Sequence, residues 1–159
     1  MIAKECCISK GKGVSENGLP SFDKALLEAG VGNYNLVRLS SILPANCKWI
    51  DVKDIAEHIT EGSLLPTAYS TITSDTEGDT IVSTIGVGLP VDKSHVGVIM
   101  EYSTKNVTEE DALETLRSMI REAFEVRGWE LEDMICTSIS DKVDKGGVKH
   151  TTFCCISEW

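Results

Sequence analysis

The chain has 159 residues, of which 42% are hydrophobic and 25% charged, a composition typical of one folded domain. The formal net charge of −10 argues against a nucleic-acid partner, because phosphates would be repelled over most of the surface. No apolar run approaches the roughly 18 residues of a membrane span, and the apolar stretch near the N-terminus is too short for a secretory signal. We therefore expect a single cytoplasmic domain over residues 1–159.

Hydrophobic periodicity predicts an alternation of strands and helices. In chain order they are a strand at 2–9, a helix at 21–30, strands at 33–41, 64–75, 79–90 and 95–105, a helix at 108–128, and strands at 129–140 and 149–159. Residues 10–20 are rich in Gly and Lys and indicate a loop, while residues 44–63 mix a loop with short strand or turn pieces. Residues 76–79 predict a hairpin turn, and residues 141–147 are expected to join the last two strands as a pair. This order indicates an α+β fold, a sandwich with helices packed outside antiparallel-rich sheets.

End signals define the two predicted helices. Ser21 is the expected N-cap of the first helix, Asp23 lies favourably in its first turn, and Gly30 supplies its stop. Thr108 starts a capping pattern for the second helix, and Gly128 ends it. Its apolar face is formed by residues at helical spacing, namely Leu113, Leu116, Ile120 and Phe124. That face must lie on a sheet.

The six cysteines do not suggest a disulfide framework. Four of them form the vicinal pairs Cys6-Cys7 and Cys154-Cys155. Neighbours in a strand point to opposite faces, so these pairs are poorly placed to bridge. Reduced and mostly buried thiols are the better interpretation.

Motifs for a metal ion or a nucleotide are weak. The three histidines, His58, His95 and His150, are far apart and form no H-x-x-x-H pattern. A metal site assembled from distant residues, or a Cys-His nucleophile, stays open only as a minor alternative. The stretch "GVGNYN" begins as G-x-G but lacks the third glycine and enters a strand, so it does not predict a nucleotide-binding loop.

Polar residues at strand positions are the better candidates for chemistry. Glu101 interrupts the apolar stretch "GVIMEYSTK", where a carboxyl either serves as a general acid or marks an exposed strand end. Asp23 is either a functional carboxylate or a helix first-turn acid, and Asn35 shares one strand face with Ser41. Ser40 and Ser41 in "RLSSILP" lie where an apolar strand meets a proline-bounded loop. They are either strand-end residues or the two sides of a reactive peptide bond.

Four stretches together resemble the pyruvoyl-dependent arginine decarboxylase family. They are "FDKALLEAGVGNYNLVRLSSILP", "LLPTAYSTITSD", "GVIMEY" and "FEVRGWELE". The match runs from about Ser21 to the C-terminus, with the family's order and nearly its spacing. The resemblance implies an αββα sandwich assembled as a trimer, with sites at the subunit interfaces.

The resemblance also implies self-cleavage between Ser40 and Ser41, giving a β chain (1–40) and an α chain (41–159). In the family, the hydroxyl at the position of Ser41 attacks the preceding carbonyl, the amide becomes an ester, and β-elimination leads to a pyruvoyl group. This covalent group is the cofactor, in place of pyridoxal phosphate and without a metal. It forms a Schiff base with L-arginine, which loses carbon dioxide to give agmatine, an early step of polyamine synthesis.

Three further roles follow from the resemblance. Asn35 matches an active-site residue that can donate to the oxyanion or to the pyruvoyl carbonyl, and Glu101 matches the proposed proton donor. Asp23 matches a carboxylate that reaches the substrate guanidinium from a neighbouring subunit. A carboxylate suits this role because it can bind a guanidinium through two parallel hydrogen bonds. Residues 45–63 carry no motif that can be matched. Two alternatives stay open: a pyruvoyl decarboxylase of another amino acid, and an unprocessed, non-catalytic homologue acting as an assembly subunit.

Overall fold

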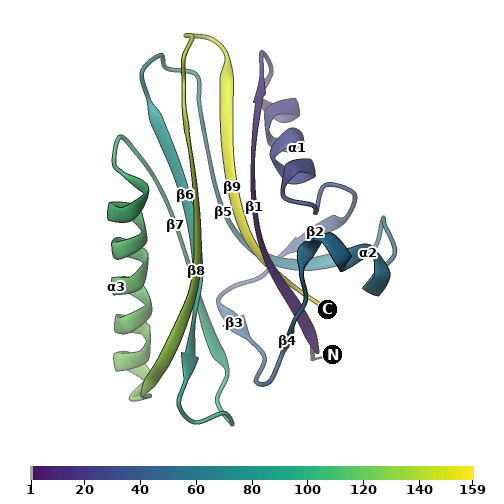
Figure 1. Cartoon of the computed structure of the whole chain (residues 1–159), viewed down its shortest axis with the longest axis vertical. Helices are drawn as coiled ribbons and strands as arrows, with labels where there is room; N and C mark the ends of the chain where they lie inside the picture. The colour runs from purple at the N-terminus through teal and green to yellow at the C-terminus, as the bar shows by residue number, and fades with distance from the viewer. Residues whose placement is uncertain (1) are drawn as a thin grey trace.

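The computed structural model describes residues 2–159, which form two β-sheets flanked by helices (Figure 1). The strands are β1 (Glu5–Ser15), β2 (Asn35–Arg38), β3 (Ile42–Leu43), β4 (Lys48–Trp49), β5 (Leu64–Ser74), β6 (Thr80–Pro90), β7 (Gly97–Lys105), β8 (Leu131–Lys142) and β9 (Lys149–Glu158). The helices are α1 (Gly18–Glu28), α2 (Ile55–His58) and α3 (Glu109–Arg127), with a 3-10 turn at Val52–Asp54. The first sheet has the strand order β2-β5-β9-β1-β4, and the second has the order β3-β7-β6-β8. The predicted α+β class is confirmed.

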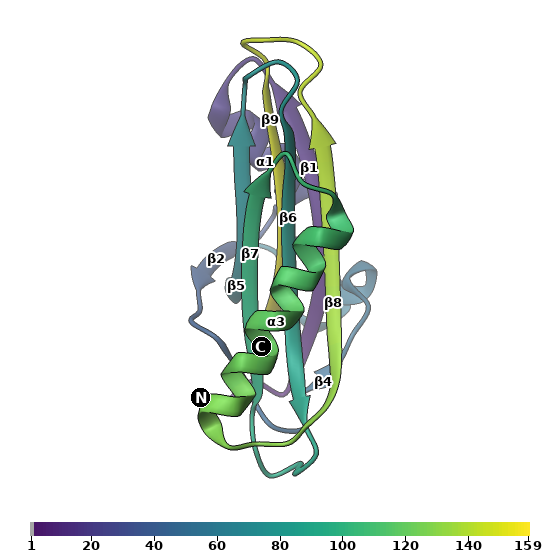
Figure 2. The same ribbon diagram turned by 90° about the vertical axis from the view of Figure 1, so that its left-hand side faces the viewer.

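The helices and sheets stack in four layers. The helix α1 packs on β1 and β9, and α3 crosses β6, β7 and β8 on the outer face of the second sheet (Figure 2). Apolar clusters fill the spaces beneath α1, between the sheets and beneath α3. The vicinal cysteines follow this layering as predicted. Cys6 and Cys154 lie between the sheets, whereas Cys7 and Cys155 face α1.

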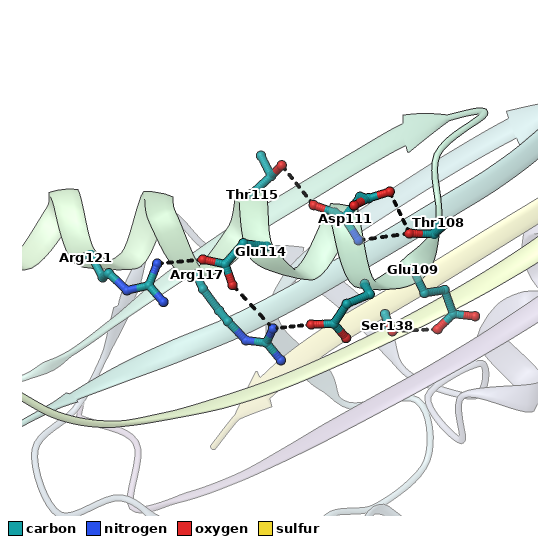
Figure 3. Close-up of polar contacts among 9 residues, drawn as sticks. Thr108, Glu109, Asp111, Glu114, Thr115, Arg117, Arg121 and Ser138 are labelled. Carbon is teal, nitrogen blue, oxygen red and sulfur yellow. Dashed lines mark hydrogen bonds and ion pairs between the residues drawn. The ribbon is translucent and has the colours of Figure 1, made fainter.

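The helix α3 begins and ends where the sequence predicts. The Thr108 hydroxyl oxygen accepts a hydrogen bond from the Asp111 amide at 3.1 Å, which satisfies one of the unpaired N–H groups of the first turn. Gly128 adopts a left-handed conformation with φ of 64°. The core-facing residues of α3, Leu116, Ile120 and Phe124, are at most 2% exposed. Arg117 and Arg121 bind acidic residues along the outer face (Figure 3).

The predicted loop at residues 10–20 is wrong in its first half, because β1 continues through it and pairs with β9. Gly11 and Gly13 face α1 here. A Cβ on Gly11 would lie 2.2 Å from the Ala25 carbonyl oxygen, and one on Gly13 would lie 2.1 Å from the Ser21 carbonyl oxygen. These glycines therefore permit the close approach of a helix to a strand, and they do not mark a turn.

The start of α1 also differs from the prediction. The helix begins at Gly18, and Ser21 is a buried helical residue instead of the N-cap. The Ser21 hydroxyl lies 2.7 Å from the Gly18 carbonyl oxygen and 2.8 Å from the Thr151 hydroxyl on β9. Asp23 consequently lies beyond the first turn. Gly30, with φ of 79°, follows the end of the helix as expected.

Two predicted strand pairings are wrong. The turn at residues 76–79 joins β5 to β6, and the turn after β8 leads to β9, but each turn links strands of different sheets. Gly78 and Gly147 supply left-handed backbone with φ of 88° and 82°. The turn signals were therefore correct, but such residues cannot distinguish strands that pair within a sheet from strands that stack between sheets.

The segment 44–63 contains β4, the 3-10 turn and α2. This agrees with the predicted mixture of short pieces. Across residues 2–159, no helix combines the length and the apolar character that a membrane crossing would need.

Candidate active site

The peptide bond between Ser40 and Ser41 lies where the chain passes from the first sheet to the second. The last backbone hydrogen bond to the first sheet runs from the Leu39 amide to the Thr67 carbonyl, at 3.0 Å. The first bond to the second sheet runs from the Ile99 amide to the Ser41 carbonyl, at 2.7 Å. The strand β3 then pairs with β7. The Ser40-Ser41 bond therefore lies between two backbone hydrogen bonds, one to each sheet.

This crossing overturns the predicted strand at residues 33–41. The stretch contains β2, which ends at Arg38, and β3 begins only at Ile42 in the other sheet. Packed sheets lie about 10 Å apart, so a chain that changes sheets must leave the strand conformation on the way. Asn35 and Ser41 consequently do not share one strand face.

Asn35 opens β2 and is bound to the turn that precedes β5. Its side-chain amide donates to the Gly62 carbonyl at 2.7 Å, and its backbone amide donates to the Ser63 carbonyl at 2.9 Å. The residue is exposed. The amide nitrogen of Asn35 has a second N–H that this bond leaves available.

Glu101 lies on β7, two residues beyond Ile99 and on the same strand face. Ile99 belongs to the cluster between the sheets, whereas Met100 and Tyr102 pack beneath α3. The Glu101 side chain is 32% exposed. Its Oε2 atom is buried and has no hydrogen-bond partner within residues 2–159. The carboxyl thus faces the edge of the space between the sheets, on the strand whose Ile99 amide binds the Ser41 carbonyl.

Arg38 is the site residue that sequence reasoning missed. Its Nη2 atom donates to Oε1 of Glu101 and to the backbone carbonyl of Tyr69, the latter at 3.2 Å. Its guanidinium carbon lies 4.4 Å from the centre of the Tyr69 ring. The hydrogen bond to Glu101 raises the pKa of the guanidinium. A lone cation within the apolar stretch "NLVRLSS" was the available signal.

Asp23 lies apart from this group within one chain. It is exposed on α1, which covers the outer face of the first sheet (Figure 1). In the part of the chain that the structure describes, no hydrogen bond or ion pair connects Asp23 with Ser41, Asn35 or Glu101. One protomer alone does not bring the predicted substrate carboxylate to the serine pair.

The remaining polar candidates are dispersed. The histidines have separate partners: His58 contacts Glu5, His95 stacks on Trp129, and His150 contacts Asp141. Over residues 2–159, no group of three or more His, Cys, Asp or Glu side chains could hold a metal ion. Burial raises the pKa of the Cys7 thiol to about 12 and that of the Cys155 thiol to about 11. Such thiols stay protonated and are poor nucleophiles.

These features define a class of small α+β sandwich in which a serine pair crosses between two sheets beside an arginine–glutamate ion pair. Residues 5–156 match the family model described as pyruvoyl-dependent arginine decarboxylase. The chain belongs to the pyruvoyl-dependent arginine decarboxylase family.

Curated archaeal proteins with this name resemble the chain over most of its length. The protein of Methanococcus aeolicus is 40% identical over 152 residues, which is 94% of this chain and 86% of the relative. That of Methanocaldococcus jannaschii is 42% identical over 137 residues, covering 86% of this chain and 80% of the relative. That of Pyrococcus abyssi is 46% identical over 116 residues, covering 73% and 71% respectively.

Proposed function

We propose that this chain cleaves itself between Ser40 and Ser41 and decarboxylates L-arginine to agmatine and carbon dioxide. The cofactor is a pyruvoyl group made from Ser41, with neither pyridoxal phosphate nor a metal ion. Family membership supports the reaction. The observation that supports assigning this reaction to particular residues is the position of the Ser40-Ser41 bond at the sheet crossing, beside Glu101. Free and mostly buried thiols support a reducing, cytoplasmic compartment.

The crossing suits self-cleavage because both sides of the bond are held while the bond itself is not part of a strand. The Ser41 hydroxyl attacks the Ser40 carbonyl carbon, and the acyl group moves from nitrogen to oxygen. Elimination then releases the Ser40 carboxylate, and addition of water with loss of ammonia leaves the ketone at position 41. Hydrogen bonds from Leu39 and to the Ser41 carbonyl keep both new ends in place.

A pyruvoyl group at position 41 fits the residues around it. The Ile99 amide holds the carbonyl of residue 41 at 2.7 Å, and this contact does not involve the atoms that change. When formed, the group supplies a ketone that withdraws electrons from the bond to the departing carboxylate. Glu101 then has the role of returning a proton to the substrate α-carbon, with Asn35 donating a hydrogen bond to an oxygen at the site.

Recognition of the guanidinium belongs to Asp23 of a neighbouring subunit in this proposal. A carboxylate pairs with a guanidinium through two parallel hydrogen bonds, which selects arginine over shorter or neutral side chains. Because Asp23 is exposed and distant from Ser41 within one chain, a self-associated form, a trimer as in the family resemblance, is needed. Val37 and Leu64 are apolar side chains 44% and 72% exposed near the β2 edge, which favours a subunit contact there.

The test is an assay of purified protein with a panel of amino acids, measuring carbon dioxide and the amine product. We expect arginine to be turned over in preference to lysine, ornithine and the acidic amino acids. Preferred release of carbon dioxide from another amino acid would support the alternative decarboxylase. Absence of any turnover together with an uncut chain would support the non-catalytic assembly subunit.

A further inference from the structure

The proposed reaction gives no part to Arg38, although its guanidinium is held by several contacts. It donates to Glu101 and to the Tyr69 carbonyl, and it lies over the Tyr69 ring. The Arg38 side chain is 54% exposed, yet these contacts fix it across the gap between the two sheets. A planar guanidinium bound in this way has a defined orientation as well as a charge.

The ion pair also spans the cleavage point. Arg38 lies in residues 1–40 and Glu101 in residues 41–159, so the pair joins the two chains that cleavage would produce. Ser40 follows Arg38 by two residues, or about 6–7 Å of extended chain, which is within reach of an arginine side chain. Cleavage places a new carboxylate on Ser40. The Arg38 guanidinium would then have two carboxylates within reach, those of Glu101 and Ser40, instead of one.

We propose that Arg38 is a positioning residue that couples self-cleavage to the protonation of Glu101. This inference rests on the function proposed above. In the intact chain, Arg38 pairs with Oε1 of Glu101. After cleavage, the Ser40 carboxylate shares the guanidinium, and Glu101 takes up a proton from water. The same event thus creates the ketone and the proton donor.

The proton goes to Glu101 and not to Ser40 for reasons of solvation. Two carboxylates at one cation repel each other, which favours uptake of a proton by the less hydrated of the two. Ser40 is exposed, so its carboxylate keeps its hydration, and an α-carboxyl ordinarily loses its proton at lower pH than a glutamate side chain. Glu101 is partly buried, and its Oε2 has no partner among residues 2–159. Protonation there removes a charge from a poorly hydrated position.

Among residues 2–159, the cation paired with Glu101 is Arg38. Arg38 approaches Glu101 from β2. From β5, the Tyr69 ring lies against the Arg38 guanidinium. On β6 the residue paired with Glu101 is Ile85, which does not titrate. A change at Arg38 should therefore act directly on the protonation of Glu101.

The test compares the protonation of Glu101 in cleaved and uncleaved protein. Carbon-13 NMR of chains labelled at the glutamate carboxyl carbon gives the titration midpoint, and Glu101→Gln identifies the signal. We expect the midpoint in the processed wild type to be higher than in uncleaved Ser41→Ala by about one pH unit or more. Equal midpoints in the two proteins would overturn the inference.

Variants of Arg38 separate coupling from a general effect of cleavage. In Arg38→Gln, Glu101 should titrate at high pH already in the uncleaved chain, so that the difference between cleaved and uncleaved forms shrinks. Arg38→Lys keeps the charge and should restore part of that difference. The control is Arg121→Gln, since Arg121 pairs with Glu114 on the surface of α3. A difference that persists in Arg38→Gln contradicts the inference.

If Ser41→Ala does not fold, the pH profile of arginine turnover by processed protein gives the answer. Loss of the cation in Arg38→Gln should move the alkaline limb of kcat to higher pH, while Arg38→Lys and Arg121→Gln stay near wild type. An unmoved limb overturns the coupling while leaving the decarboxylase intact. A wild-type chain that never cleaves overturns the proposed function itself.

Discussion

Glu158 is a buried carboxyl that the proposed reaction does not use. It lies on β9 opposite Cys6 of β1, and burial raises its pKa to about 7. Its Oε2 atom has no hydrogen-bond partner in the described part of the chain. Below the pKa of the unfolded state, near 4.5, both folded and unfolded chains carry the proton, so ionisation of this carboxyl does not reduce the stability of the fold. As the pH rises from there to about 7, only the unfolded chain releases the proton, and stability falls.

Replacing Glu158 with Gln should remove this penalty. In the uncleaved Ser41→Ala background, we expect Glu158→Gln to raise the free energy of unfolding at pH 8 by about 1–3 kcal/mol and to have little effect at pH 4.5. Urea denaturation at the two pH values measures the difference. The control is Glu57→Gln, an exposed glutamate of α2. A loss of stability at pH 8, or a gain that is the same at both pH values, would contradict this explanation.

Asp23 tests the substrate assignment at the same scale. Asp23→Asn keeps the size of the side chain but removes the charge that would pair with the guanidinium, so the KM for arginine should rise by at least tenfold. Self-cleavage should continue, because Asp23 is distant from Ser41 in its own chain. Glu28→Gln, an exposed carboxylate on the same helix, is the matched control. Unchanged kinetics for arginine in Asp23→Asn would show that another group recognises the substrate.

At the scale of elements, the position of α1 depends on two glycines in β1. Gly11→Ala would place a Cβ 2.2 Å from the Ala25 carbonyl oxygen, which is backbone and cannot rotate away. The helix must shift, and overpacking of this kind ordinarily costs about 1–3 kcal/mol. Urea denaturation in the Ser41→Ala background measures the loss. Gly146→Ala is the control, since its nearest contact would be an ordinary 3.7 Å, and it should change stability by less than about 0.5 kcal/mol.

Because α1 also carries Asp23, the processed Gly11→Ala protein should have a higher KM for arginine as well as lower stability. A Gly11→Ala protein as stable as wild type would mean that the helix is free to move and that the glycines are not required for its position.

The elements also show which parts of the fold were predictable from the sequence. The helix α3 has local end signals and an apolar face, and its bounds were predicted within a residue of those found. By contrast, the sequence predicts a loop at Gly11 and Gly13, because glycine is locally a turn former. Their actual role, to let α1 pack closely on β1, depends on a contact with another segment that the local sequence does not show. The pairing of β5 with β9, and of β8 with β6, depends equally on contacts between distant segments.

The sequence pattern singled out Ser40, Ser41 and Glu101 as candidates, and the family resemblance supplied their roles. The Ser41 carbonyl accepts a hydrogen bond from the Ile99 amide of β7, the strand that carries Glu101. The alignment of Asn35 with Ser41 failed, because alternation along a strand cannot reveal that the chain changes sheets between them. Arg38 was missed because a single cation in a strand gains its meaning from Glu101, which is distant in sequence.

At the scale of the whole molecule, the sandwich explains how a chain could be cut and remain one protein. Residues 1–40 contribute β1, which lies between β9 and β4, and β2, which pairs with β5. The proposed fragments are thus joined by three strand pairings and by the packing of α1. They should stay associated under native conditions and separate only when the protein is denatured.

The most direct test of the account is the intact mass of freshly purified protein under denaturing conditions. We predict two chains, divided after Ser40, whose masses sum to that of the uncut chain plus one water and minus one ammonia. That balance distinguishes a pyruvoyl terminus from simple hydrolysis, which would add one water and release no ammonia. A single uncut chain that persists through long incubation would contradict the account, and Ser40 and Ser41 would then be structural residues at the crossing between the sheets.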